Sequence, residues 1–286
     1  MTGTAILPPI TTYTMVSAHE ASYVASFSSS DPQTKSDATY FKAIAAKLTT
    51  PDALLKNYRA LGIVLNAFGI NSYIHDTALL KQLMTQNPNA KSSTAYQINN
   101  PALTRFATAM GQFTSPPFAS ASNVTALLNA NATNNFETQK DSLAPGIANA
   151  LYFTRSIGAI TSVDQLMSDP KLLQVAQVAT SMPTSFGTLD FTTQHKLLSA
   201  KININDFQKS GFTQEFVTKY LALNEANSTT PNDNSGAIAI LSSNGSAGNI
   251  LNALLPNYTT NSDPALILFS NGTNPSSGTS ILSLIA

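Results

Sequence analysis

Residues that could carry acid–base, nucleophilic or metal chemistry are few in this chain. It has three histidines and no cysteine, which excludes a thiolate nucleophile and a cysteine zinc site. His19, His75 and His195 have no second histidine or acid at metal-ligand spacing. His75 and Asp76 are adjacent, and adjacent side chains on a helix point in different directions. Glu20, next to His19, is expected to be solvated. We therefore predict no metal ion.

Two short stretches resemble ligand-binding or catalytic motifs. Residues 245–248 contain a serine between glycines, but without the Gly-x-Ser-x-Gly elbow they indicate a turn. Lys35, Ser36 and Asp37 suggest a binding motif. Ser36 or Asp37 is better explained as a helix cap, with the aromatic pair that follows entering the core. The 15 acidic residues are spread thinly, and nothing in the sequence singles out a pair of them as the two carboxylates that glycoside hydrolysis needs. We predict no enzyme activity and no cofactor.

The composition favours contact with other protein surfaces. Only 10% of the 286 residues are charged, against about a quarter in typical proteins, and the net charge is zero. Asn, Ser, Thr and Gln replace the missing charges, so little like-charge repulsion keeps copies apart. The same surface would suit an acidic environment outside the cell. No basic stripe is present, so nucleic acid is not an expected partner.

The N-terminal residues do not resemble a cleaved signal peptide. Residues 1–34 contain no Lys or Arg, and Pro8 and Pro9 interrupt the only apolar run. No stretch is long enough for a membrane-spanning helix. This polar start fits a cytosolic protein, and equally a substrate of a secretion system that reads an uncleaved N-terminus.

Four segments follow one another along the chain. We expect a polar, flexible extension (1–30), a first helical unit (31–113), a Ser/Asn-rich linker with a second helical unit (114–225), and a tail (226–286). The predicted fold class is mainly α. Besides the helix that follows Thr50, helices are expected over residues 37–47, 74–86, 101–112, 137–158, 171–180, 190–199 and 213–224.

The two helical units look like diverged copies of one unit. When the sequence is shifted by 112 positions, Tyr40 and Phe41 align with Tyr152 and Phe153. The same shift aligns three further pairs, Thr49 with Thr161, Asp52 with Asp164, and Leu54 with Leu166. At a shift of 114, residues 83–84 align with 197–198 and residues 103–106 with 217–220. Similarity that keeps its order and nearly its offset indicates duplication.

The clearest helix is expected after Thr50, which can cap it, with Pro51 at the first position and Asp52 beside the positive end of the dipole. Its apolar face at helical spacing comprises Leu54, Leu55, Tyr58, Leu61, Leu65 and Phe68. Gly69 can end it in the left-handed conformation.

The second copy starts with Ser162 and Gln165 at capping-box spacing. Pro170 then breaks the helix, and Asp169 can cap the next one. On this pattern the copies diverge where the first has its long helix.

The tail has a repeat of its own. Residues 239–246 resemble residues 266–273, and each has Asn-Gly between apolar runs, which predicts a β-hairpin. Uncharged strands of this kind pair with other chains, unless they pack on the helical body. The candidate assembly residues are Ile238, Ile240, Leu266, Ile267, Leu268, Phe269, Ile281, Leu282 and Leu284.

The string from Asp52 to Ile70, in which Ala67, Phe68 and Gly69 form the helix end, resembles the signature helix of a bacterial family, domain of unknown function 1217. Residues 37–41, 48–50 and 98–106 fit the same pattern, and the resemblance covers roughly residues 31–225. It implies an all-helical duplicated fold and an association with flagellar gene clusters of alphaproteobacteria. It supplies no catalytic residues.

The chain departs from that pattern in three ways: residues 179–181 replace the Ala-Phe-Gly helix end in the second copy, the charge content is low, and the tail is additional.

Three functions remain open on sequence grounds. The first is an extracellular or cell-surface structural component, exported without a cleaved signal peptide. It would assemble with itself, as a homo-oligomer or filament, or with other flagellar or filament proteins, through its tail and termini. The second is a cytoplasmic adaptor or chaperone-like module that binds a partner in a groove between the units. The third, ranked last, is an enzyme acting on a polymer.

Overall fold

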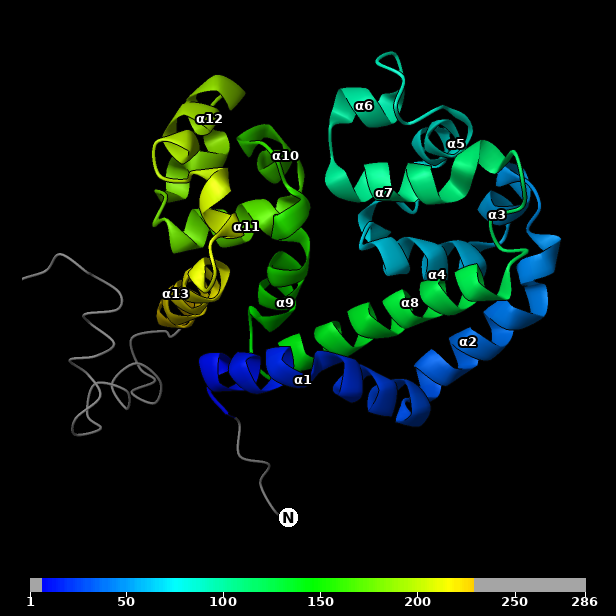
Figure 1. Cartoon of the computed structure of the whole chain (residues 1–286), viewed down its shortest axis with the longest axis horizontal. Helices are drawn as coiled ribbons and strands as arrows, with labels where there is room; N and C mark the ends of the chain where they lie inside the picture. Colours follow the sequence, from blue (N-terminus) through cyan, green and yellow to red (C-terminus); the bar gives the residue numbers. More distant parts are fainter. Residues whose placement is uncertain (1–6, 229–286) are drawn as a thin grey trace, which may run out of the picture. The chain divides into compact units, whose positions relative to one another are not determined.

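The computed structural model describes residues 7–228, and every regular element in that part of the chain is a helix. The α-helices of Figure 1 are α1 (Pro9–Ser30), α2 (Pro32–Ile44), α3 (Pro51–Lys56), α4 (Tyr58–Phe68), α5 (Thr77–Thr85), α6 (Thr94–Ile98), α7 (Pro101–Met110), α8 (Ala121–Asp141), α9 (Ile147–Ser156), α10 (Val163–Ser168), α11 (Pro170–Ala179), α12 (Phe191–Ser199) and α13 (Phe212–Ser228). The short 3-10 helices are η1 (Ala45–Lys47), η2 (Asn71–Tyr73), η3 (Gly111–Phe113), η4 (Ile157–Ala159), η5 (Thr184–Thr188) and η6 (Ile204–Gln208). The predicted mainly α fold is confirmed for this part.

No helix between residues 7 and 228 has the length and apolar character needed to cross a membrane.

Two hydrophobic cores organise the described helices. The first core is formed by buried side chains of α2 to α7, and the second core by those of α1 and α9 to α13. Helix α8 belongs to both: Val124, Leu127 and Leu128 lie in the first core, whereas Ala132 and Phe136 lie in the second. Figure 1 shows α8 running along α4 towards α1, and both packings are extensive. This one helix therefore ties the two cores together.

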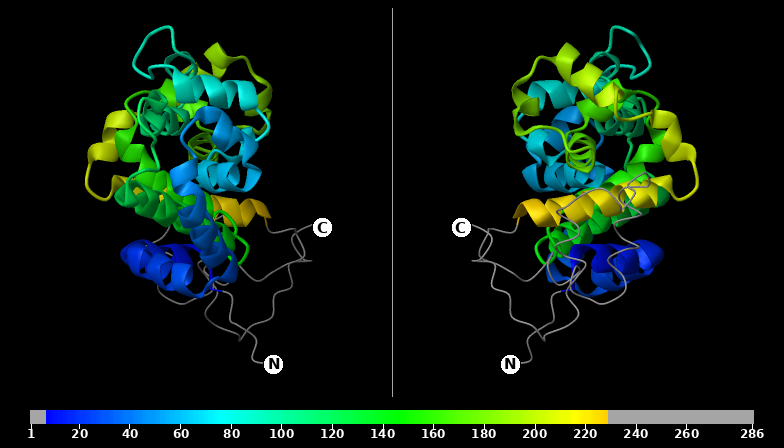
Figure 2. Two further views of the ribbon diagram at one scale, coloured as in Figure 1. Left: turned by 90° about the vertical axis from the view of Figure 1, so that its right-hand side faces the viewer. Right: turned by 90° about the vertical axis from the view of Figure 1, so that its left-hand side faces the viewer.

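Most of the N-terminal extension is a core helix, so the prediction that residues 1–30 are a flexible extension is wrong for α1. Tyr13 is fully buried, and Val16 and Val24 lie in the second core. The helix packs on α8, α9 and α13 (Figure 2). Pro9 occupies the first helical position, where a missing N–H costs nothing. The prolines that seemed to interrupt an apolar run in fact start a helix.

We expect Val16→Ala to lower the free energy of unfolding by about 2 kcal/mol, because it leaves a void in the second core. Met15 is the matched control, since its side chain is 48% exposed and Met15→Ala removes little buried surface. Urea unfolding followed by circular dichroism measures both. Equal values for the two variants would mean that α1 is not part of the core.

The Ser/Asn-rich segment predicted as a linker forms α8 over most of its length, so that prediction is also corrected. Three of its asparagines, Asn131, Asn134 and Asn135, contact α4 instead of remaining in solvent. Asn66 Nδ2 donates to Oδ1 of Asn131 and of Asn135, at 2.8 Å each. Asn134 Nδ2 donates to the backbone carbonyl of Asn66. Amides that pair with one another across two helices can be buried, which composition alone does not reveal.

The helix predicted over residues 137–158 is interrupted. Helix α8 ends at Asp141 and α9 begins at Ile147, with Gly146 between them at φ +96°. Asp141 Oδ1 accepts the backbone N–H groups of Gly146 and Ala148 at 2.9 and 3.0 Å. Pro145 is the sequence signal for this break, since it cannot continue the hydrogen bonding of α8.

The helix predicted after Thr50 starts and ends as expected but is broken inside. Thr50 accepts the Ala53 N–H at 3.2 Å, and Gly69 ends α4 at φ +73°. Asn57 separates α3 from α4, and its side chain accepts the Ala60 N–H at 3.0 Å. Tyr58 is consequently 60% exposed and does not belong to the apolar face. The cap-forming side chain of Asn57 offers the backbone an alternative to a continuous helix.

The helix start predicted at Ser162 and Gln165 is confirmed. Ser162 accepts the Gln165 N–H at 3.2 Å, and the Gln165 side chain reaches back to the N–H of Thr161. Asp169 caps α11, and Pro170 is its first residue. The helix predicted after Thr50 has a break of its own at Asn57, 112 positions before Asp169, so the predicted difference between an unbroken and a broken helix is wrong.

Candidate functional site

Several predicted site residues lie outside the described part of the chain. The nine tail residues proposed for assembly, Ile238, Ile240, Leu266, Ile267, Leu268, Phe269, Ile281, Leu282 and Leu284, are among them, as are both predicted hairpins. Residues 7–228 hold no cluster of three or more His, Cys, Asp or Glu that could bind a metal. His195 Nε2 lies 3.4 Å from one oxygen of Asp164, with both side chains substantially exposed.

The Lys35-Ser36-Asp37 stretch lies inside α2, so the expectation that Ser36 or Asp37 caps a helix is wrong. Asp31 caps α2 by accepting the Thr34 N–H at 2.7 Å. Ser36 and Asp37 instead both bind Arg59 of α4, with its Nη2 2.7 Å from Ser36 Oγ and 2.9 Å from Asp37 Oδ1. The stretch therefore joins α2 to α4.

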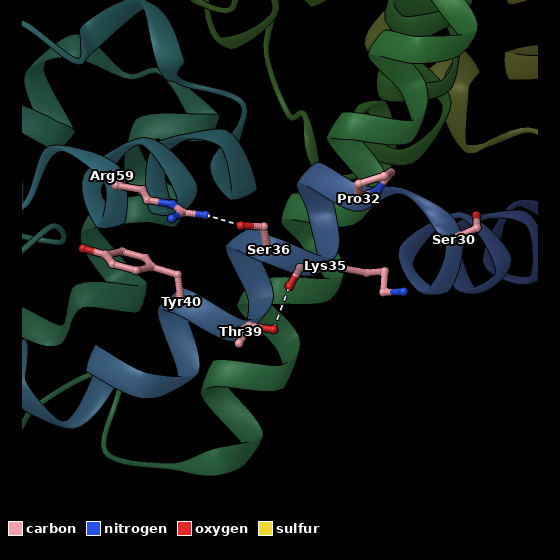
Figure 3. A pocket seen from close by; sticks show the side chains of 7 residues that line it. All are labelled: Ser30, Pro32, Lys35, Ser36, Thr39, Tyr40 and Arg59. Atoms are coloured by element: carbon pink, nitrogen blue, oxygen red, sulfur yellow. Dashed lines mark hydrogen bonds between the residues drawn. The ribbon is translucent and has the colours of Figure 1, made fainter.

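Arg59 forms part of a surface feature that we call the first socket, comprising Tyr40, Asn57 and Arg59. The Tyr40 hydroxyl donates to Asn57 Oδ1 at 2.9 Å, the same oxygen that caps α4. The Arg59 guanidinium lies 4.4 Å from the centre of the Tyr40 ring, as Figure 3 shows. Around them is an open hollow of about 580 Å³, lined also by Ser30, Pro32, Lys35, Ser36 and Thr39.

The three positions that lie 112 residues further along the chain form what we call the second socket: Tyr152, Asp169 and Lys171. The Tyr152 hydroxyl donates to Asp169 Oδ2 at 2.6 Å, and Asp169 Oδ1 accepts the first amides of α11. Lys171 Nζ lies 4.9 Å from the centre of the Tyr152 ring. Both the tyrosine and the acid are buried, at 3% exposure. Burial and then the neighbouring Asp169 charge raise the pKa of Tyr152 well above its ordinary value, so its hydroxyl remains a donor.

Two groups from the first core cover the second socket. Arg105 of α7 donates from Nη2 to the Tyr152 hydroxyl at 3.2 Å. Gly69, at the C-terminal end of α4, lies so close that a Cβ atom on it would be 3.6 Å from both the Tyr152 ring and Lys171 Nζ. The glycine thus supplies a positive φ, while the helix end it forms packs on the neighbouring core.

A cavity of about 610 Å³ lies beside this contact, with walls from both cores. Tyr96, Asn99 and Arg105 line it from one side, and Ser156, Ala159 and Gln165 from the other. Ser156 Oγ, buried next to Tyr152, makes no hydrogen bond of ordinary geometry. Asn99 holds a left-handed conformation, φ +54°, and its carbonyl accepts from Ser168 Oγ at 2.8 Å.

A partly buried ionic cluster lies where α1 packs on α8 and α9. Arg155 donates from both terminal nitrogens to the carboxylate of Glu137, which is 3% exposed, and Nη1 also lies 3.4 Å from Glu20 Oε1. Burial and the Glu137 charge raise the pKa of Glu20 to about 7, although Arg155 opposes them. The prediction that Glu20 is solvated is therefore wrong.

Sequence reasoning missed both sockets, although a signal for them was present. The shift of 112 positions had already aligned Tyr40 with Tyr152. Followed further along the chain, the same shift also aligns Asn57 with Asp169 and Arg59 with Lys171. A hydroxyl donor, an oxygen acceptor and a cation therefore recur at one spacing.

Comparison with known proteins bears on this fold and not on its activity. A solved structure of a protein from Agrobacterium tumefaciens matches with a TM-score of 0.67 and 18% sequence identity, over 77% of this chain and 94% of that one. At that identity the likeness shows a shared fold. A search of curated proteins finds no match. The model of a family described as "Protein of unknown function (DUF1217)" matches residues 67–212, just over half of the chain. The chain belongs to the DUF1217 family.

Proposed function

We propose that this protein is a structural component that assembles with copies of itself, and that its fold consists of two diverged copies of one helical unit. The observation that carries the proposal is the recurrence of the socket, made of the same three positions and the same hydrogen bond. Proteins built from repeated units bury surface by stacking one unit on the next, and the same contact can continue between chains.

The order and spacing of the helices support the duplication. Helices η1 and α3 recur as η4 and α10 at the shift of 112, and α5 recurs as α12 at the shift of 114. Thr50 and Ser162, at equivalent positions, both cap the helix that follows. Phe41 and Phe153 are both fully buried. Independent helical units have no reason to share breaks, caps and buried aromatics at one offset.

The finer features of this proposal are an extracellular or cell-surface location, a filament-like and flagellum-related assembly, and self-association through the tail and termini. The low charge of the sequence supports them, because little repulsion opposes close packing. Light scattering and negative-stain electron microscopy on the full chain and on residues 1–228 test them. Filaments, tubes or rings that vanish on truncation would assign assembly to the tail. A full chain that stays monomeric at high concentration would contradict the proposal.

A reciprocal exchange of helix-end residues tests the duplication. Ser181, the equivalent of Gly69, also has a positive φ, at +51°, and residues with a Cβ atom adopt this conformation at a cost. We expect Ser181→Gly to raise the free energy of unfolding by about 1 kcal/mol, and Gly69→Ser to lower it by about 1 kcal/mol. Urea unfolding measures both. Changes of the same sign in the two variants would mean that the two positions are not equivalent.

The cavity between the cores favours a second candidate, the adaptor that binds a partner segment inside the cell. Its walls offer amides, an exposed arginine and the buried Ser156 hydroxyl, which are groups that hydrogen-bond an extended peptide. Fractionation of cells that produce the full chain tests it. Retention in the cytoplasm favours the adaptor, whereas recovery from the medium or the cell surface favours the structural component.

A further inference from the structure

We propose that the first socket receives the C-terminal end of helix α11 from a second copy of this chain, so that copies associate head to tail. This inference rests on the proposed function and specifies an interface for it. It follows from a comparison of the two sockets, of which one is covered within the chain and the other is open.

The covered socket shows what such a site binds. Tyr152 and Asp169 are buried, and the end of α4 at Gly69 packs on Tyr152 and Lys171. This contact is heterologous, since a helix end of the first core meets a socket of the second. A contact of that kind leaves one helix end and one socket without a counterpart in the same chain.

The open socket is the one on the first core. Tyr40 is half-buried, whereas Tyr152 is 3% exposed, and the Arg59 side chain is 43% exposed. A hollow of about 580 Å³ borders Tyr40 and Arg59, whereas at the second socket the end of α4 packs on Tyr152 and Lys171. Figure 3 shows the guanidinium of Arg59 above the Tyr40 ring at this surface.

The helix end that remains is that of α11. Its last turn closes like that of α4: the Met182 N–H donates to Gln177 and the Ile70 N–H to Leu65, both at 2.9 Å. Ser181 holds the left-handed conformation of Gly69 and is exposed. The two helix ends therefore present the same backbone geometry, one inside the molecule and one on its surface.

Charge favours this occupant. The carbonyl groups at a helix C-terminus carry partial negative charge, and Lys171 Nζ lies beside Gly69 at the C-terminal end of α4. Arg59 occupies the equivalent place in the first socket and would face the end of α11, where the Thr180 carbonyl already accepts from Lys201 Nζ at 2.8 Å. The hydrogen bond from Arg105 to the Tyr152 hydroxyl is not expected to have a counterpart between copies. The first socket has the neutral Asn57 where the second has the charged Asp169, and the residue equivalent to Arg105 is Lys219. The proposed contact between copies therefore shares the helix end with the contact inside the chain, and does not include a second cation.

Site-directed cross-linking of the full chain tests the interface, since the chain has no cysteine of its own. Ser36→Cys marks the first socket and Ser181→Cys marks the end of α11. With a short bis-maleimide, we expect dimers from the mixture of the two single variants and none from either alone. A chain with both substitutions should give a ladder of oligomers. Thr125→Cys, at an exposed position of α8, replaces Ser181→Cys as the control and should give no dimer with Ser36→Cys.

A second pair of variants keeps the test specific. Arg59→Lys reproduces the residue of the second socket and should retain cross-linking between Ser36→Cys and Ser181→Cys. Arg59→Ala should reduce the yield of cross-linked dimer by tenfold or more at unchanged helical content.

If light scattering shows self-association but the mixed variants do not cross-link, this interface is wrong and the proposed function stands. If the full chain does not associate at any concentration, both fail. Dimers from Ser36→Cys alone would also overturn the head-to-tail arrangement.

Discussion

Asp169→Ala is expected to lower the free energy of unfolding by about 3 kcal/mol. The carboxylate is 3% exposed and accepts three hydrogen bonds, two from the first amides of α11 and one from the Tyr152 hydroxyl. Alanine leaves all three donors without this partner, and Tyr152 has no water within easy reach because it is buried. An unsatisfied buried donor costs more than the net gain from one hydrogen bond, so the loss exceeds that of an ordinary cap.

Asparagine at the same position is the matched control, because the first socket uses Asn57 there. An amide oxygen can still cap α11 and accept the Tyr152 hydroxyl, so Asp169→Asn should cost about 1 kcal/mol or less. Asn57→Ala removes the same two kinds of hydrogen bond at a half-buried position and should cost about 1 kcal/mol. Urea unfolding ranks the three variants. Equal losses for Asp169→Ala and Asn57→Ala would show that burial does not distinguish the two sockets.

Local features of the fold were predictable from sequence because their causes are local. Thr50 and Ser162 cap helices through their own side chains, and Gly69 ends one because it lacks a Cβ atom. Helix α1 was missed because its stability comes from packing in the second core and not from charge or propensity. The asparagines of α8 were assigned to a linker for the same reason, since only their partners on α4 make them suitable for burial.

The two sockets were not predictable in this way. The shift of 112 positions aligns Tyr40 with Tyr152. The hydrogen-bond partner of Tyr40, however, is Asn57, which is available because the chain breaks between α3 and α4. The apolar spacing predicts a continuous helix through Asn57, and such a helix gives no sign that Asn57 accepts from both the Tyr40 hydroxyl and the Ala60 N–H. Burial separates the two sockets further, because Arg105 and Gly69 reach Tyr152 only through the packing of the two cores. Residue spacing along the chain does not predict such contacts between distant segments.

Glu20→Gln is expected to make the fold more stable at alkaline pH and to leave it nearly unchanged in acid. The folded protein raises the pKa of Glu20 from 4.5 to about 7, so it holds a proton that the unfolded chain has released. This group therefore favours folding below pH 4.5, and its contribution is lost as the pH rises through 7. A shift of that size corresponds to a loss of at most about 3 kcal/mol, since one pKa unit is worth about 1.4 kcal/mol. Glutamine cannot ionise, and it can still donate to Glu137.

The partner carboxylate should respond in the opposite direction. Glu137 is almost fully buried and binds both terminal nitrogens of Arg155, so Glu137→Gln removes the main counter-charge of a partly exposed guanidinium. Losing these charge-assisted hydrogen bonds costs about 2 kcal/mol, and the substitution also removes the negative charge that helps to raise the pKa of Glu20. Urea unfolding between pH 4.5 and 8 separates the two effects. The difference between Glu20→Gln and the unmodified chain should grow with pH, whereas Glu137→Gln should be destabilised throughout. If the curve of Glu20→Gln runs parallel to that of the unmodified chain, Glu20 does not carry a proton in the folded state at neutral pH. The contact of α1 with Arg155 would then be an ordinary ion pair.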